Sequence, residues 1–573
     1  MSNLFILIIK NNQNGLINFN MKLKCSYLFH IKTKVMCGIL AIIGRKEEKI
    51  ESIQALSKRM SHRGPDESDI HITETGAILS HERLAIIDIN TGKQPIQGTS
   101  TAWMIHNGEI YNYKALKENE LKDHSFRTTS DSEVIVHLYE KFGYSFVDKL
   151  DGDFAFVVVD GKDFIAARDP IGVKPLYYGT DEFGAMWFSS EMKVLADQCE
   201  TFEAFPPGYY YTPDTGFVQY YKPKWYSPEK SKEDGDMVKL REALISATKK
   251  RLMADVPLGV LLSGGLDSSL TSSIAARILG ESGKKLHSFS IGLDSAAPDL
   301  IAAKKVADFL GTEHHEIHFS VEEGIEIIKK LIWHLETYDV TSVRASTPMY
   351  FLSKAITEKG IKVVLSGEGA DEIFGGYLYF KNAPSAEEFQ KETVRRVKRL
   401  STADCLRADK STMAHGLEAR VPFLDKAFIQ TAMEISPEFK MPSSYDGVEK
   451  YILRKAFDTP ERPFLPDEVL WRQKEQFSDG VGYSWIDSLI EYAASKVSDV
   501  EMETAASKYP VNTPATKEAY FYREIFHSYF PQDCAAKSVK RWIPKWQADL
   551  DPSGRANTTH IAKADMSKVG QKV

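Results

Sequence analysis

Cysteine is scarce in this chain, and its spacing is not that of a metal-binding or disulfide-rich fold. The 573 residues include five cysteines: Cys25, Cys37, Cys199, Cys405 and Cys534. They are far apart and form no CxxC pair, so the sequence predicts neither a zinc ribbon nor a disulfide framework. Because free thiols persist in a reducing compartment, we expect a cytoplasmic protein.

Long apolar runs and a strong charge of one sign are also missing. The run from Leu4 to Ile9 is far too short to cross a bilayer, and Lys10 follows it instead of preceding it, so neither a membrane span nor a secretory signal is predicted. With 72 basic and 79 acidic residues the net charge is −7, which gives no global attraction for nucleic acid or anionic lipid. We therefore expect small-molecule substrates, and neither nucleic acid nor membrane as a partner.

The composition is that of a globular protein with several segments. Apolar residues make up 43% and charged residues 26% of the chain, and its length suggests about three or four domain-sized units, or two large ones. Residues 1–36 contain no acidic residue, and we expect an N-terminal leader or a misassigned start there. An organelle-targeting peptide is a further interpretation, but such peptides are rich in Arg.

The next segment, residues 37–221, is rich in short apolar or alternating runs, with two stretches of helical spacing. These patterns predict an α+β domain with layered sheets. The Asp160-Gly161 pair between two runs predicts a hairpin. The expected strands are 39–43, 77–79, 101–106, 154–159 and 164–167, and the expected helices are 53–60 and 132–142.

A linker is expected over 222–240, and the pattern then changes to alternating strands and helices over 241–530. Such alternation predicts right-handed βαβ units and a parallel sheet. The tail, 531–573, is polar. The expected strands are 256–262, 287–293, 315–319 and 361–365, and the expected helices are 267–279, 298–310, 321–335 and 346–359.

The sequence Ser263-Gly264-Gly265-Leu266-Asp267-Ser268 lies between an expected strand and an expected helix. A glycine turn there aims backbone N–H groups and a helix N-terminus at one point, which favours phosphate binding. It is not a P-loop. Asp267 would repel a phosphate unless Mg²⁺ lay between them. The alternative is an ordinary Ser-Gly turn.

A second glycine-rich loop, Ser366-Gly367-Glu368-Gly369-Ala370-Asp371-Glu372, follows another expected strand. Both loops would leave the carboxyl ends of parallel strands, where ligands bind. Its three acids suit metal ligands or a base near an amine, although a solvated acidic loop remains an alternative. Arg344, among hydroxyl residues, and Lys450 could bind a carboxylate or phosphate, but each alone is more often a surface charge.

Cys37 is a candidate nucleophile. It follows Met36, and after removal of the preceding chain its α-amine could act as the base for its own thiol. Segments containing Arg83, Asn107-Gly108-Glu109 and Asp131 could bind an α-amino acid with a side-chain amide. From chemistry alone a buried strand cysteine is the more common situation. The sequence His314-His315-Glu316-Ile317-His318 is not HExxH, and we expect a histidine-rich strand without a metal there.

In this order, these motifs resemble the glutamine-hydrolysing asparagine synthetases of bacteria and plants. The resemblance runs from Met36 to about Phe530. It rests on Cys37-Gly38-Ile39, His62-Arg63-Gly64-Pro65-Asp66, His81-Glu82-Arg83-Leu84, Asn107-Gly108-Glu109-Ile110-Tyr111-Asn112, the 263–268 loop, Glu336-Thr337-Tyr338-Asp339, the 366–372 loop and Glu418-Ala419-Arg420-Val421-Pro422-Phe423-Leu424-Asp425. It implies an N-terminal-nucleophile glutaminase domain with an αββα sandwich, followed by an α/β parallel-sheet synthetase domain similar to the ATP pyrophosphatases.

The resemblance also implies site residues. The catalytic group would be Cys37, Asn107, Gly108, Glu368, Arg344 and Lys450. Glutamine would bind Arg83, Leu84, Ala85, Ile86, Ile87, Asn107, Gly108, Glu109 and Asp131. ATP would bind Leu261, Ser263, Gly264, Gly265, Asp267, Ser268, Ile291, Ser366 and Gly367, with Asp267 and Asp371 as Mg²⁺ ligands.

The implied reaction is ATP-dependent synthesis of asparagine from aspartate and glutamine-derived ammonia through β-aspartyl-AMP, releasing AMP, pyrophosphate and glutamate. ATP is a substrate, Mg²⁺ the cofactor, and a homodimer the expected assembly. The family's cysteine must be the first residue, so while residues 1–36 remain attached glutamine hydrolysis should fail and ammonia-dependent synthesis could persist. Alternatives are a relative that makes another amide bond or a β-lactam, and an RNA-modifying or non-catalytic protein with the same phosphate loop, although no basic patch supports RNA binding.

Overall fold

The computed structural model describes residues 37–45, 49–64, 66–474, 477–482 and 484–547. It separates Met1–Lys32 from Thr33–Val573, and the fold below is that of the second unit. The predicted extension, 1–36, and residues 548–573 of the predicted tail lie outside the described residues. None of the described helices is long and apolar enough to cross a membrane.

The first sheet has the strand order β10-β8-β9-β1-β3-β2 and is antiparallel. Its central strand β1 is apolar at successive positions because both of its faces are buried. Leu40 and Ile42 pack on the side of helix α1, whereas Ile39 and Ala41 face the second sheet. The strands are β1 (Gly38–Ile43), β2 (Glu67–Ile72), β3 (Ile78–Arg83), β8 (Tyr177–Thr180), β9 (Met186–Ser189) and β10 (Thr201–Ala204).

The second antiparallel sheet, in the order β12-β11-β7-β6-β5-β4, lies against the first. Alternate residues of β6 again serve two cores: Ala155 and Val157 pack between the sheets, and Phe154 and Phe156 pack against α3. The predicted hairpin is present, with Asp160 paired to Asp163. The strands are β4 (Ile96–Gln97), β5 (Trp103–Ile110), β6 (Gly152–Asp160), β7 (Asp163–Arg168), β11 (Tyr209–Thr212) and β12 (Gly216–Gln219).

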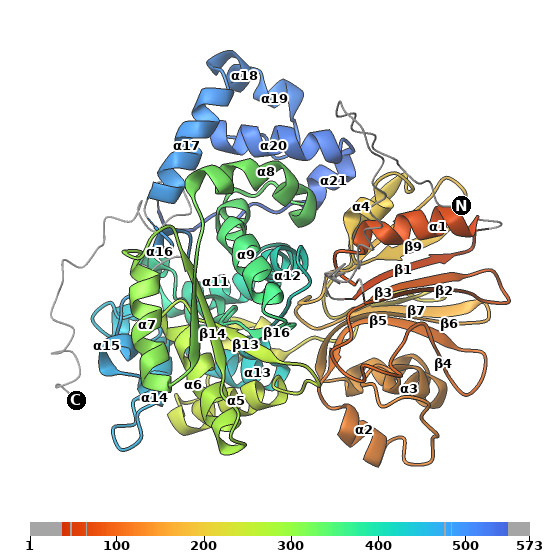
Figure 1. Cartoon of the computed structure of the whole chain (residues 1–573), viewed down its shortest axis with the longest axis horizontal. Helices are drawn as coiled ribbons and strands as arrows, with labels where there is room; N and C mark the ends of the chain where they lie inside the picture. Colours follow the sequence, from red (N-terminus) through yellow and green to blue (C-terminus); the bar gives the residue numbers. More distant parts are fainter. Residues whose placement is uncertain (1–36, 46–48, 65, 475–476, 483, 548–573) are drawn as a thin grey trace, which may run out of the picture. The chain divides into compact units, whose positions relative to one another are not determined.

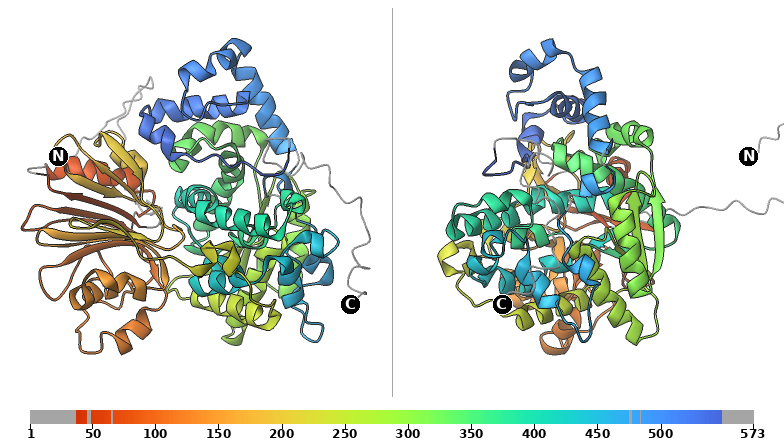
Figure 2. Two further views of the ribbon diagram at one scale, coloured as in Figure 1. Left: turned by 180° about the vertical axis from the view of Figure 1, so that it is seen from behind. Right: turned by 90° about the vertical axis from the view of Figure 1, so that its left-hand side faces the viewer.

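Helices cover the outer faces of the two stacked sheets, so the predicted αββα sandwich is confirmed (Figures 1 and 2). The helices of this part are α1 (Ile50–Ser57), α2 (Tyr113–Asn119), α3 (Val134–Phe142) and α4 (Met192–Leu195).

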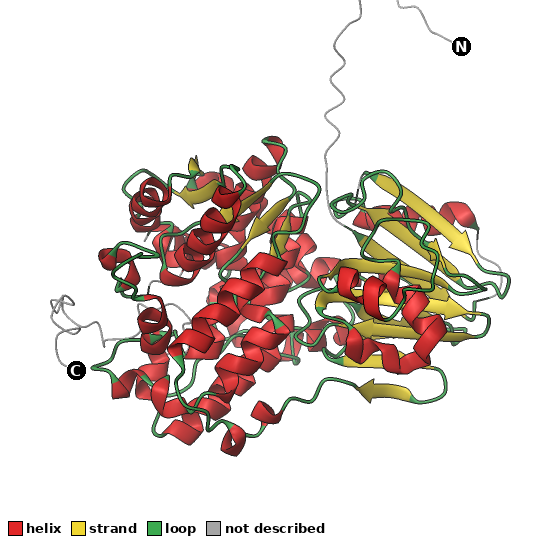
Figure 3. Ribbon diagram, turned by 90° about the horizontal axis from the view of Figure 1, so that it is seen from below, coloured by secondary structure: helices red, strands yellow, loops and turns green. Residues whose placement is uncertain are grey.

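The third sheet is parallel, in the order β15-β14-β13-β16-β17, and confirms the predicted α/β architecture. Val260 and Leu365 pack toward α6, whereas Leu261 and Phe289 belong to the core shared with α8 and α9. Helices therefore surround this sheet, as Figure 3 shows. Its strands are β13 (Leu258–Leu261), β14 (His287–Gly292), β15 (Glu313–His318), β16 (Val363–Leu365) and β17 (Glu418–Arg420).

The helices of this part have clear local signals. Helix α7 starts at Pro298, whose missing N–H costs nothing there, and is followed by Gly311 in the left-handed conformation. Ser320 and Glu323 form a capping box at the start of α8. The helices are α5 (Met237–Lys250), α6 (Leu266–Glu281), α7 (Pro298–Leu310), α8 (Val321–Leu335), α9 (Val340–Glu358), α10 (Ala370–Phe374), α11 (Ala386–Arg399), α12 (Asp404–Met413), α13 (Lys426–Glu434), α14 (Tyr451–Phe457), α15 (Asp467–Leu470), α16 (Phe477–Gly480), α17 (Ser484–Lys496), α18 (Asp499–Glu503), α19 (Ala505–Lys508), α20 (Lys517–Tyr529) and α21 (Asp533–Ser538).

Three differences from the sequence-based expectations matter. Helix α9 begins at Val340 rather than at residue 346, because the side chain of Asp339 caps it and Pro348 is accommodated inside it. Helix α5 begins inside the expected linker, and β17 was not predicted at all. The expected domain boundaries themselves stay predictions.

A buried arginine ties the sandwich to the helices around the parallel sheet. Arg63 Nη1 lies 2.6 Å from Glu191 and 2.8 Å from Asp409 of α12, and the Arg63 side chain is 0% exposed. Removing one partner of such a pair leaves uncompensated charge in a low-dielectric interior.

We expect Arg63→Met to lower the free energy of unfolding by about 3–5 kcal/mol, because Glu191 and Asp409 lose their shared partner. Scanning calorimetry measures this as a lower melting temperature. The control is Lys304→Gln, which breaks an exposed pair with Asp308 and should cost about 0–1 kcal/mol. Equal melting temperatures for the two variants would contradict the expectation.

Candidate active sites

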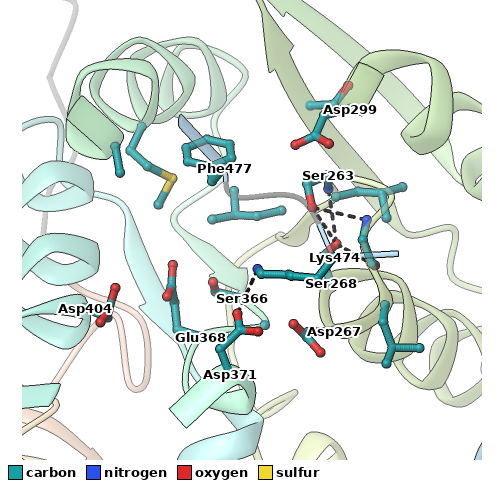
Figure 4. Close-up of a pocket in the computed structure, with 18 of the residues that line it drawn as sticks. Ser263, Asp267, Ser268, Asp299, Ser366, Glu368, Asp371, Asp404, Lys474 and Phe477 are labelled. Atoms are coloured by element: carbon teal, nitrogen blue, oxygen red, sulfur yellow. Dashed lines mark hydrogen bonds and ion pairs between the residues drawn. The ribbon is translucent and has the colours of Figure 1, made fainter. Parts of the chain in front are cut away.

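The larger cavity lies where β13 and β16 end, and it gathers most residues predicted for the nucleotide. Figure 4 shows the two loops that follow these strands facing each other across it. The predicted residues that line it are Leu261, Ser263, Gly265, Asp267, Ser268, Ile291, Ser366, Gly367, Glu368, Asp371 and Lys450.

The 263–268 loop is held by its own serines. Ser268 Oγ accepts from Ser263 N at 3.2 Å and lies 3.1 Å from Ser263 Oγ, which accepts from Gly265 N at 3.3 Å. Gly264 does not line the cavity but has a φ of 71°, and a Cβ on it would lie 2.5 Å from the backbone of Ala302. The loop is thus fixed before the start of α6, whose first N–H groups favour an anion.

The second loop comes very close to the first. A Cβ on Gly367 would lie 2.8 Å from Ser268 N, which is closer than real contacts allow. Glycine at this position therefore lets Ser366 and Glu368 face the same cavity as the 263–268 loop.

Two lysines neutralise the acids at the base of the cavity. Lys450 Nζ lies 2.5 Å from Asp267 Oδ2 and 2.6 Å from Asp371 Oδ1, and Lys474 Nζ lies 2.8 Å from Asp371 Oδ2. Burial would raise the pKa of Asp371, but the two ammonium groups outweigh it and hold the pKa at about 2. At Asp267 the effect of burial outweighs the attraction of the Lys450 ammonium, and the pKa of Asp267 is raised. Asp371 is therefore ionised at neutral pH.

Glu368 lies at another side of the cavity, toward Asp404 (Figure 4). Its Oε2 accepts from Arg407 Nη2 at 2.9 Å, and Arg407 also binds Asp404 at 3.0 Å. Burial raises the pKa of Glu368 despite the guanidinium of Arg407. A carboxylate with a raised pKa is a stronger base than an exposed one.

Several lining residues were not predicted from the sequence. Each is a charged or aromatic side chain in a segment without a glycine motif, which gave no signal of its own. They include Asp299, Asp404, Arg407, Arg472, Lys474 and Trp542. Arg344, by contrast, was predicted, but its side chain binds Glu518 at 2.6 Å and does not line the cavity; its role stays a prediction.

A second, smaller cavity lies in the sandwich and gathers the residues predicted for glutamine. Those present are Cys37, Arg83, Leu84, Ile86, Ile87, Asn107, Gly108, Glu109 and Asp131. Ala85 is not among the lining residues; its backbone N–H donates to Asp66 and its carbonyl accepts from Lys362. Gln94, Ser132 and Glu418 line the cavity without having been predicted.

Cys37 immediately precedes β1, and its thiol donates to the carbonyl of Leu84 at 3.7 Å. Burial raises the pKa of the Cys37 thiol to about 12, so the thiol is protonated at neutral pH and needs a base to become a nucleophile. Asn107 Oδ1 is buried without a hydrogen-bond partner among the described residues. Gly108 has a φ of 139°, and a Cβ there would lie 2.0 Å from Asp153 O.

A row of alternating charges links this cavity to the parallel sheet. Arg420 Nη2 of β17 lies 3.0 Å from Glu109, its Nε lies 2.6 Å from Glu418, and Glu418 lies 3.1 Å from Lys174. The backbone carbonyl of Arg420 accepts from Ser366 N at 2.8 Å. Arg420 thus contacts residues that line each of the two cavities.

Asp131 is the other acid of this cavity. Its Oδ2 accepts from the backbone N–H of Ile110 at 2.7 Å. Burial nevertheless raises the pKa of Asp131 to about 6. Its charge is therefore lost in mildly acidic solution.

Comparison with known proteins gives consistent matches over both parts. A glutamine amidotransferase domain family matches residues 36–208, and an asparagine synthase family matches 239–389 and 382–551. A rice protein, "Asparagine synthetase [glutamine-hydrolyzing] 2", is 53% identical over 91% of this chain and 92% of its own. "Asparagine synthetase [glutamine-hydrolyzing] 3" of Arabidopsis thaliana is 53% identical over 91% of this chain and 94% of its own.

Among solved structures, the "structure of the allosteric regulatory enzyme of purine biosynthesis" covers 49% of this chain with 16% identity and a TM-score of 0.30, which is too low to support an argument. The family matches span more than half of the chain, and the relatives match it at about half of all positions. With both cavities in place, the chain belongs to the glutamine-hydrolysing asparagine synthetase family.

Proposed function

We propose that this protein makes asparagine from aspartate and ATP with ammonia released from glutamine, and that β-aspartyl-AMP is the intermediate. The observation that carries the proposal is the presence of two built cavities in one chain, one around a thiol and one around a phosphate-type loop, joined through β17. AMP, pyrophosphate and glutamate are the other products.

In the smaller cavity the thiol of Cys37 attacks the side-chain amide of glutamine, ammonia leaves, and water then hydrolyses the thioester to glutamate and the free thiol. The developing oxyanion is stabilised by the Asn107 side chain and the Gly108 N–H. Arg83 and Asp131 bind the carboxylate and amine of glutamine, and Glu109 assists. Because its pKa is high, the thiol stays protonated at neutral pH and needs a base. The α-amine of Cys37 takes this proton once that amine is free.

In the larger cavity the β-carboxylate of aspartate attacks the α-phosphorus of ATP. The 263–268 loop retains the pyrophosphate, and Leu261, Ile291, Ser366 and Gly367 contact the nucleotide. Lys450 and Lys474 neutralise charge on the phosphates, and Arg344 has the same predicted role. Glu368 takes a proton from ammonia as it attacks the acyl carbon and AMP leaves.

Two carboxylates in this cavity fit a magnesium ion. Asp267 Oδ1 is buried and has no hydrogen-bond partner among the described residues, and carboxylate oxygen is the ligand that Mg²⁺ prefers. Asp267 and Asp371 would hold Mg²⁺, which would draw charge from the phosphates of ATP. We further propose a cytoplasmic homodimer, which the family resemblance predicts.

Ammonia has to travel between the cavities without meeting bulk water, which would protonate it. The strand β17 connects the two cavities: Glu418 lines the smaller one, and the carbonyl of Arg420 accepts a hydrogen bond from the backbone N–H of Ser366, which lines the larger one. We propose that ammonia passes through the interior beside this strand.

Cys37 supplies the first prediction. A protein starting at Cys37 should make asparagine from glutamine, whereas one that retains the preceding residues, and Cys37→Ala, should lose glutamine-dependent synthesis by about 10³-fold or more because the base or the nucleophile is missing. Ammonia-dependent synthesis should persist in all three. The buried cysteine variant Cys199→Ala is the matched control. Equal glutamine-dependent rates in Cys37→Ala and the control would overturn the assignment.

Asp131 predicts a pH dependence of glutamine binding. Below its pKa of about 6 the carboxyl is neutral and no longer attracts the glutamine ammonium, so KM for glutamine should rise as the pH falls through 6. In Asp131→Asn, KM should be raised above pH 6, approach the wild-type value below it, and lose this dependence. The exposed Asp123→Asn should behave as wild type; a pH profile in Asp131→Asn like that of wild type would contradict the role.

Lys474 predicts a defect confined to the larger cavity. Without its ammonium, Asp371 is less well neutralised and the phosphates lose a cation, so Lys474→Met should slow pyrophosphate release by about 10²–10³-fold. Glutamine hydrolysis should change little. Lys455→Met, which alters an exposed lysine of α14, is the control, and a rate equal to that control would refute the assignment.

A further inference from the structure

Three potential metal ligands converge at the amino ends of β14 and β15. His287 begins β14 and pairs with Glu313, which begins β15, and His315 pairs with Phe289. Because side chains alternate along a strand, His287, Glu313 and His315 all lie on the same face of the sheet. His314 lies on the opposite face, where its ring nitrogens contact Ser288 and Ser290.

The distances between the ligand atoms fit a tetrahedral ion. His287 Nδ1 lies 3.3 Å from His315 Nε2, and each of these nitrogens lies 3.7 Å from Glu313 Oε1. With metal–ligand bonds of about 2.0–2.2 Å, a tetrahedral zinc site separates its ligand atoms by about 3.3–3.6 Å. The spacings of the three atoms therefore differ from those of such a site by only a few tenths of an ångström.

The surroundings hold the imidazoles in place and leave one side open. The ring of His315 stacks on buried Phe289 at 4.8 Å, and the two imidazoles are within 15° of parallel. Their nitrogens face each other in a hydrogen bond, so an ion has to replace the shared proton and each ring has to turn toward it. The side chain of Glu313 is 52% exposed, so water can occupy a fourth position.

The nature of the ligands selects the class of ion. Two imidazoles and one carboxylate suit Zn²⁺ and similar divalent transition metals, whereas Mg²⁺ requires oxygen ligands. Among the residues that the structure describes, this is the one cluster of three histidine, cysteine or acidic side chains with ligand atoms this close together.

The cluster is separate from the two cavities. Ile291, which lines the nucleotide cavity, is four residues further along β14 than His287, or about 13 Å along the strand. The cluster therefore lies at the opposite end of the sheet from the phosphate loop, and β15 is the edge strand of that sheet.

We propose that His287, Glu313 and His315 form a second metal site, for Zn²⁺ or a similar transition-metal ion, that ties the edge strand β15 to β14. Bound metal cross-links two neighbouring strands and so stabilises the sheet that carries the nucleotide loops. The site is distinct from the magnesium proposed for ATP and does not depend on the proposed function.

The test is Zn²⁺ binding to the full chain, measured by competition with a coloured zinc chelator in Mg²⁺-containing buffer. Wild type should bind one Zn²⁺ that His287→Ala and His315→Ala do not bind. Each of the two substitutions should lower the affinity for Zn²⁺ by more than the roughly 10–100-fold that is lost when a residue hydrogen-bonded to a metal ligand is replaced. The matched control is His314→Ala, on the same strand but the opposite face, which should bind as wild type does.

Two further readouts guard against misfolded variants. Glu313→Gln keeps the size of the side chain and its exposed position, and it should weaken Zn²⁺ binding while the circular dichroism spectrum stays unchanged. Co²⁺ should give the intense visible absorption of a tetrahedral site in wild type and His314→Ala, but not in Glu313→Gln. Equal Zn²⁺ binding by wild type and all three ligand variants, or displacement of Zn²⁺ by millimolar Mg²⁺, would overturn the proposal.

Discussion

Strand β17 carries Glu418 and Arg420 into the buried space between the two cavities. Each of these charges needs a partner of opposite sign, and this need constrains the residues that pack around the strand. Taking charges out of water costs several kcal/mol per ion unless each finds a partner. Here Lys174, Glu418, Arg420 and Glu109 alternate in sign along one row. Each of these charges therefore has an oppositely charged neighbour, and β17 pairs with β16, where the backbone carbonyl of Arg420 accepts from Ser366 N.

Much of the fold follows from local sequence signals. Helices α7 and α8 begin and end where the sequence predicts, because Pro298, Gly311 and the Ser320–Glu323 box are local features. The three-residue strand β17 could not be predicted this way. Glu-Ala-Arg has no strand pattern. It is extended because β16 pairs with it, and oppositely charged buried side chains neutralise Glu418 and Arg420.

The site residues divide in the same way. Cys37 and the two glycine-rich loops were predicted because their residue types and spacings carry the chemistry themselves. Arg407 and Lys474 were missed because a single basic residue outside a motif looks like any surface charge until the fold brings an acid to it. Arg344 is the reverse case: its neighbours suggested a binding site, and the fold places its side chain against Glu518 instead.

The contributions of Glu418 and Trp542 set an order of events during biosynthesis. Both sheets of the sandwich can pair once residue 219 has left the ribosome, but the pocket around Cys37 lacks a wall until Glu418 emerges. The nucleotide cavity is completed later still, when Trp542 reaches it and the backbone N–H of Trp542 donates to the Asp339 carboxylate. A nascent chain therefore carries the thiol of Cys37 long before it carries all the residues that line either cavity.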